Sequence, residues 1–102
     1  MTLKSSQSNI ASFAAIFPSG DEIGDVVAFY AVPSAAIIRV KASSLKVGDA
    51  VWIRGSTTDL KETVRSMEID RQPVMEARAG QEVGIKVSAK VRKHDRVYKI
   101  SA

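Results

Sequence analysis

The chain has 102 residues, a length that suits one domain with one modest hydrophobic core. It contains no cysteine, which excludes disulfides and thiolate metal sites, and no apolar run approaches the roughly 20 residues that a membrane-spanning helix needs. The net charge of +4 is unevenly placed. Residues 86–99 carry six Lys and Arg side chains against Asp95, a local excess of +5, so the other residues sum to −1. We therefore expect a localised surface that attracts anions.

Residues 1–20 are predicted to form an N-terminal tail, flexible or loosely packed on a domain that occupies residues 21–102. The segment is Ser-rich at first, apolar over residues 10–17, and then interrupted by Pro18 and Gly20. The apolar run is similar to the core of a signal peptide, but only Lys4 precedes it as a basic residue and no clear cleavage site follows. We therefore expect a cytoplasmic protein.

From Ile23 onward the sequence shows the alternation of β-strands. Side chains that share a face are predicted in four runs: Val26, Ala28 and Tyr30; Ala36, Ile38 and Val40; Val51 and Ile53; and Val83, Ile85 and Val87. In the third run, Trp52 and Arg54 face outward. A polar loop is expected at residues 55–59, and Gly84 is expected to leave room for a neighbouring backbone. These runs contain no sustained helical period.

Three tight turns are predicted: at residues 45–49, within residues 76–87 ahead of an alternating strand, and at residues 92–96. The third turn contains the only histidine, His94. Because histidine tolerates a left-handed backbone better than most residues, we interpret His94 as a turn residue rather than a proton-transfer or metal-binding group.

The apolar spacing slips in residues 64–69, which predicts a bulge near Arg65–Ser66. Pro73 is unsuited to a central strand, so residues 71–80 are predicted to form a connection. About six closely spaced strands then remain, and the sequence predicts an all-β barrel.

The patterns that support enzymatic chemistry are missing from the sequence. No Gly-x4-Gly-Lys-Ser/Thr run occurs, and the single asparagine, Asn9, cannot form the guanine-reading element of a GTPase. Glu68 and Asp70 share a strand face but are interpreted as solvated residues rather than an acid/base pair. We therefore expect no enzymatic activity, and no nucleotide, metal, cofactor or membrane as a ligand.

RNA is the predicted partner. The candidate RNA-binding residues are Lys86, Lys90, Arg92, Lys93, Arg96, Arg54 and Trp52. Contacts between these cations and phosphates would make binding sensitive to salt and tolerant of sequence, and Trp52 beside Arg54 would stack on a base. Two alternatives stay open: the cations form only a solvated face, and Trp52 packs under the tail or against a protein partner.

The turns and core positions also carry a family resemblance. They are Leu45-Lys46-Val47-Gly48-Asp49 with Val51, Ile53 and Gly55; Val64 with Ser66-Met67; Ala77, Gly80 and Val83-Gly84-Ile85; and Val91-Arg92 with Asp95 and Val97-Tyr98. Over residues 23–100 the chain resembles the second domain of translational GTPases such as elongation factor Tu, as a stand-alone version. This resemblance implies a small closed six-stranded Greek-key barrel that contacts tRNA, ribosomal RNA or a ribonucleoprotein.

Similar barrels occur as small elongation-factor-like proteins and as C-terminal parts of collagenase-like peptidase-family proteins. That likeness implies the alternative function, a protein-interaction or accessory module. Such a module would dock on an enzyme or on another copy of itself through Trp52 and the N-terminal apolar segment.

Overall fold

The computed structural model describes residues 20–100, so the predicted tail over residues 1–20 lies almost wholly outside the described residues. Within that range the regular structure consists of β-strands. The strands are β1 (Gly20–Tyr30), β2 (Ala35–Val40), β3 (Ser44–Lys46), β4 (Ala50–Arg54), β5 (Asp59–Thr63), β6 (Met67–Ile69), β7 (Gln72–Val74), β8 (Glu76–Arg78), β9 (Glu82–Lys86) and β10 (Arg96–Ile100). The all-β prediction is confirmed, although several strands are shorter than expected and their number exceeds six.

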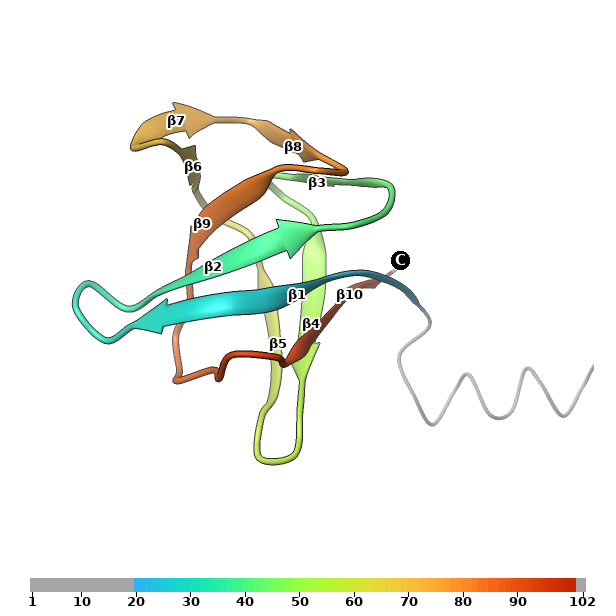
Figure 1. The fold of residues 1–102 in the computed structure, drawn as a ribbon, viewed down its shortest axis with the longest axis vertical. Coiled ribbons are helices and arrows are strands. Elements are labelled where there is room, and N and C mark those ends of the chain that lie inside the picture. Colours follow the sequence, from blue (N-terminus) through green and yellow to red (C-terminus); the bar gives the residue numbers. More distant parts are fainter. Residues whose placement is uncertain (1–19, 101–102) are drawn as a thin grey trace, which may run out of the picture.

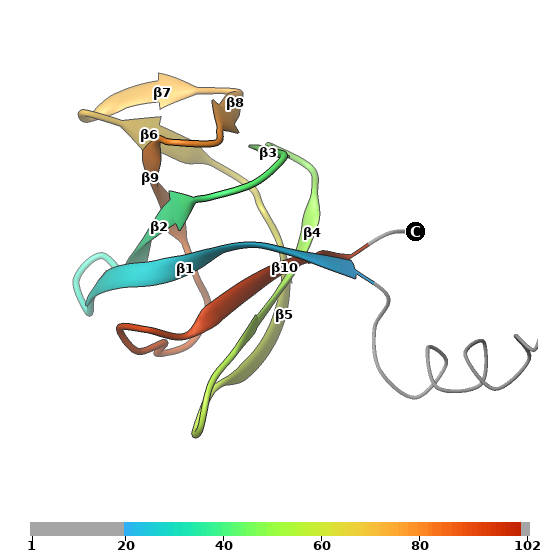
Figure 2. The same cartoon turned by 45° about the vertical axis from the view of Figure 1, so that its right-hand side comes forward.

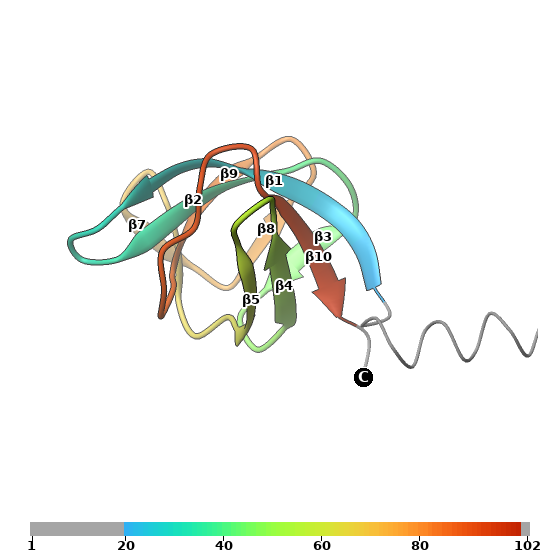
Figure 3. The same ribbon diagram turned by 90° about the horizontal axis from the view of Figure 1, so that it is seen from below.

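Eight strands form one antiparallel sheet in the order β5-β4-β10-β1-β2-β9-β6-β7, and β3 pairs with β8 in a second, small sheet. The large sheet curls around a single core (Figures 1 and 2). Strand β10 lies between β1 and β4, so the first and last strands described are neighbours. Figure 3 shows these strands and β5 following one another around one side of the molecule.

The core is formed by the side chains that alternation assigns to the inner face. The residues of the second, third and fourth predicted runs are all buried, with exposures of 4% or less. The first run is only partly right. Two register shifts in β1, between Glu22 and Gly24 and between Val26 and Ala28, change which side chains face inward. As a result Phe29 packs against the core while Tyr30 is 56% exposed.

The turn from Arg92 to Asp95 is closed by the side chain of its fourth residue. The backbone N–H of Asp95 donates to the Arg92 carbonyl (3.1 Å), and the Asp95 Oδ2 accepts from the Arg92 N–H (2.8 Å). His94, the third residue, has a φ of +79°, as a type II turn requires, so the interpretation of His94 as a turn residue is confirmed. Two further backbone hydrogen bonds tie the turn to Val26 of β1: His94 N–H to the Val26 carbonyl (2.9 Å) and Val26 N–H to the Asp95 carbonyl (2.8 Å).

The same arrangement recurs in the turns 46–49 and 78–81. In the turn 46–49, Asp49 supplies the side-chain acceptor, Gly48 has the positive φ (+99°), and the backbone of Val64 is bound. In the turn 78–81, the corresponding residues are Gln81, Gly80 (+97°) and Val40. We call each of the three a turn–valine unit. Each unit directly precedes a strand, namely β4, β9 or β10. All three tight turns predicted from the sequence are therefore confirmed.

Close backbone approach occurs at a different glycine from the one expected. A Cβ on Gly24 would overlap the backbone carbonyl of Arg39, whereas a Cβ on Gly84 would meet the Ile37 Cδ1 at 3.4 Å and the Glu68 carbonyl oxygen at 3.8 Å, both ordinary contacts. Gly24 lies at the first register shift of β1, where bulges often need glycine.

Two local predictions are wrong and one strand was not predicted. Residues 64–66 are not a bulge within one strand but connect β5 to β6, and these strands pair with different partners. Strand β5 was not predicted, because its sequence, Asp-Leu-Lys-Glu-Thr, is almost wholly polar. The predicted connection at 71–80 contains β7 and β8. Pro73 is accommodated because β7 lies at the end of the sheet order.

We predict that Asp95→Ala lowers the free energy of unfolding by about 1–3 kcal/mol, because Asp95 is only 5% exposed and the substitution removes the acceptor of a part-buried hydrogen bond from the Arg92 N–H. Urea or thermal unfolding measures the change. The matched control is Asp21→Ala on the exposed start of β1, which should stay within about 0.5 kcal/mol of the parent. Equal effects of the two substitutions would contradict this account of the turn.

Candidate functional site

Lys90, Arg92 and Lys93 lie together in the loop between β9 and β10, and we call these three the basic loop. All three side chains are exposed, and none takes part in an ion pair or hydrogen bond with another described side chain. Since the 92–95 turn is fixed through Val26, the backbone that carries two of these cations is held in place. The result is a turn held by backbone hydrogen bonds that carries exposed positive charges.

Arg96 and Arg54 extend the positive charge onto the outer face of the sheet. They are direct partners across β10 and β4, and both are exposed. Like charges placed opposite each other are unfavourable. Here Arg96 is 3.5 Å from Glu22, and the guanidinium of Arg54 lies 4.9 Å from the centre of the Trp52 ring. Both cations thus keep their heads near solvent beside the basic loop.

Trp52 lies on the outer face, as predicted, but it is covered there by side chains of neighbouring strands. The residue is only 8% exposed. Its indole N–H donates to Asp59 Oδ1 (2.6 Å), its ring lies 5.6 Å from that of Tyr98, and the Lys61 ammonium is 5.6 Å from its centre. Neighbouring side chains on β5 and β10 therefore cover the indole. Base stacking on Trp52, and docking of a partner there, would both require these covering groups to move.

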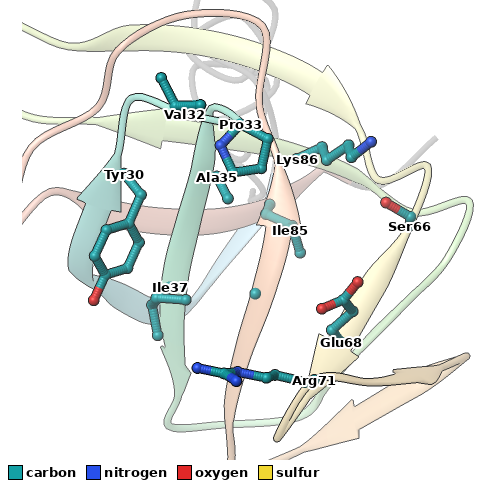
Figure 4. Close-up of a pocket in the computed structure, with 11 residues that line it drawn as sticks. Tyr30, Val32, Pro33, Ala35, Ile37, Ser66, Glu68, Arg71, Ile85 and Lys86 are labelled. Atoms are coloured by element: carbon teal, nitrogen blue, oxygen red, sulfur yellow. The ribbon is translucent and has the colours of Figure 1, made fainter.

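Lys86 lies apart from the basic loop, at the end of β9, where it lines a pocket of about 600 Å³ on the outer face of β2, β9 and β6. Gly84 leaves the centre of this face hollow, and the hairpin between β1 and β2 forms one wall. In Figure 4, Tyr30 and Ile37 lie along one side, Ser66 and Glu68 along the other, and Arg71 across the bottom. The pocket therefore combines an apolar floor with charges of both signs at its rim.

This pocket was not predicted from the sequence. Its residues come from four segments, and the exposed Tyr30 appears only because the β1 register shifts. Arg71 was assigned to a connection, but it follows Asp70 in a two-residue turn in which both residues have positive φ (+51° and +64°). Neither residue belongs to β6, so Asp70 does not share a strand face with Glu68 as expected.

No group of three or more His, Asp and Glu side chains among residues 20–100 is arranged to hold a metal ion. The same residues contain no helix long and apolar enough to cross a membrane.

The curled antiparallel sheet, with a turn–valine unit before each of three strands, defines a small all-β domain of the translation-factor type. The chain belongs to the family described as elongation factor Tu domain 2, whose family model matches residues 35–98. The fold class and the family predicted from the sequence are therefore confirmed.

Proteins described as peptidases share the domain. Over 78 residues, 76% of this chain, the sequence is 45% identical to "Uncharacterized protease MJ0090" of Methanocaldococcus jannaschii. The match covers 19% of that protein, so the chain spans about a fifth of its length. The C-terminal domain of a putative U32 peptidase from Geobacillus thermoleovorans has the same fold, with a TM-score of 0.73 at 17% identity over 78% of this chain and 99% of that one. A second structure of that domain gives the same TM-score over 79% and 93%.

Trp52 is the only tryptophan, so its fluorescence reports on one site. We predict a blue-shifted emission that iodide quenches weakly, because the indole is covered by Tyr98, Lys61 and Arg54. Asp59→Ala removes the acceptor of the indole N–H and should increase quenching, with a loss of about 1 kcal/mol of stability. Quenching of the parent protein as strong as that of free tryptophan would show that the indole is open to solvent.

Proposed function

We propose that this domain is a non-catalytic module that binds RNA through the basic loop, supported by Arg96 and Arg54. The observation that carries the proposal is the concentration of exposed cations on one rigid turn and the two strands beside it. In the basic loop no described carboxylate neutralises the three side chains, whereas Arg39, Lys41, Lys99 and the supporting Arg96 are each paired with an acid.

Such a surface suits phosphates rather than base edges. Lys and Arg on a turn reach the RNA backbone, and each phosphate that they neutralise releases counterions. Binding is then sensitive to salt and tolerant of sequence, with the sheet acting as a rigid platform. Trp52 is left out of this contact surface because its own neighbours cover it.

A second candidate function, an accessory module that contacts protein, is favoured by two observations. Related sequences and structures belong to proteins described as a protease and a putative U32 peptidase, in which the matched region is only a part. In addition, Tyr30 and Val32 at the β1–β2 hairpin are 56% and 89% exposed. Both residues line the pocket beside Ala35 and Ile37, so the exposed apolar surface is continuous there, as at contact surfaces. The hairpin therefore replaces Trp52 as the place where a protein partner would bind.

The RNA proposal predicts that Arg92→Glu with Lys93→Glu weakens binding of a single-stranded RNA at least tenfold. It also predicts that the slope of log K against log salt becomes shallower by about 1.4, since each lost phosphate contact on a single strand contributes about 0.7. Fluorescence anisotropy across a salt titration measures both quantities.

The matched control is Lys46→Glu with Arg78→Glu. These residues open the other two turn–valine units, at the end of the molecule that carries β3 and β8 (Figure 1), and the substitutions change the net charge by the same amount. The control should weaken binding much less than the basic-loop pair. Equal weakening by the two pairs of substitutions would show that binding depends on net charge and not on the basic loop. Absence of binding at low salt would exclude the proposed function.

A further inference from the structure

The turn between β6 and β7 keeps an arginine where the backbone favours glycine. Asp70 and Arg71 occupy the two central positions of a hairpin turn with positive φ at both, the geometry that Asn-Gly and Asp-Gly satisfy most easily. Asp is common at the first of these positions, but a long side chain such as Arg71 is unfavourable at the second. Residues held in such backbone regions concentrate at binding sites. This unfavourable choice therefore needs a reason.

A reason for an arginine at this position is that its side chain lines the pocket on the outer face of β2, β9 and β6 (Figure 4). Among the described residues its guanidinium makes no ion pair or hydrogen bond, although Glu68 lines the same pocket. Planar guanidinium groups bind carboxylates through two parallel hydrogen bonds. Arg71 is thus placed as an anion-binding group at the edge of an apolar floor.

We propose that this pocket binds the C-terminal residue of a peptide whose last side chain is apolar. The terminal carboxylate pairs with Arg71, the side chain occupies the floor formed by Ala35, Ile37 and Gly84, and Tyr30 covers it from the hairpin. Glu68 accepts the backbone N–H of the same residue. These four contacts satisfy every group of a C-terminal residue.

The charges of the pocket favour a peptide over a nucleotide. Arg71 and Lys86 against Glu68 leave the pocket with one net positive charge, which a single peptide carboxylate balances. A phosphate would instead bring about two negative charges near the Glu68 carboxylate. The neighbouring Val32 is 89% exposed and extends the apolar surface along which the preceding peptide residues would lie. A volume of about 600 Å³ accommodates a ligand of this size. The site deepens the accessory-module function and does not involve the basic loop.

The test uses the ¹⁵N-labelled full chain and the peptide acetyl-Gly-Ala-Phe, titrated to about 10 mM, where a site with a Kd near 1 mM is almost saturated. We expect the amide signals of Gly84 and Ile85 to shift on binding. The same peptide with an amidated C-terminus should bind at least tenfold more weakly, because the charged acceptor is lost.

Arg71→Gly gives the decisive variant. It should raise Tm by about 4–8 °C, since glycine relieves the positive φ, and also weaken peptide binding at least tenfold. Arg78→Gln, on an exposed cation outside the pocket, should leave binding unchanged. If Arg71 had only a structural role, Arg71→Gly would raise Tm without weakening peptide binding.

Three outcomes would overturn the assignment: no shift with the free-acid peptide, equal binding of acid and amide, or binding of AMP that exceeds that of the peptide. The last would assign the pocket to nucleotides instead. Reversal of Arg92 and Lys93 should leave peptide binding unchanged, so failure of this site and failure of the RNA contact are distinguishable.

Discussion

The pairing of a closed turn with one buried valine is the constraint on which the rest of this domain depends. In each turn–valine unit the fourth side chain holds the first backbone N–H, and the third and fourth residues satisfy the backbone of a valine on another segment. Val26, Val40 and Val64 are at most 2% exposed, so their polar backbone groups would be costly to bury without these bonds. Three strands therefore start at positions fixed by long-range contacts rather than by local preference.

These units also explain how much the sequence could predict. Glycine at positions 48 and 80 indicates tight turns, because glycine adopts positive φ without strain. The strands that follow alternate regularly, so the core and the family were predictable. The register shifts of β1 carry no comparable signal, because a bulge depends on the partner strand. Strand β5 holds its place through pairing with β4 despite a polar sequence.

The candidate sites were less predictable than the fold. The basic loop could be predicted from the charge excess in the sequence, because long cationic side chains on a turn extend into solvent. The burial of Trp52 depends on Asp59, Lys61 and Tyr98, which alternation places on the same outer face without specifying contact. The pocket forms because the bulge in β1 and the turn at Arg71 position two of its lining residues, and neither feature can be predicted from a hydrophobic pattern. One scaffold thus presents two separate surfaces, one cationic and one mixed.

Because the three turns share one backbone design and differ in the charge around them, they provide an internal comparison within one molecule. The most direct test of the central claim is to map a single-stranded RNA onto the ¹⁵N-labelled protein by amide chemical shifts. The account predicts shifts at residues 90–96 and at Arg54, with the turns 46–49 and 78–81 unchanged. Shifts of equal size at all three turns, or confined to segments outside residues 86–96, would contradict it.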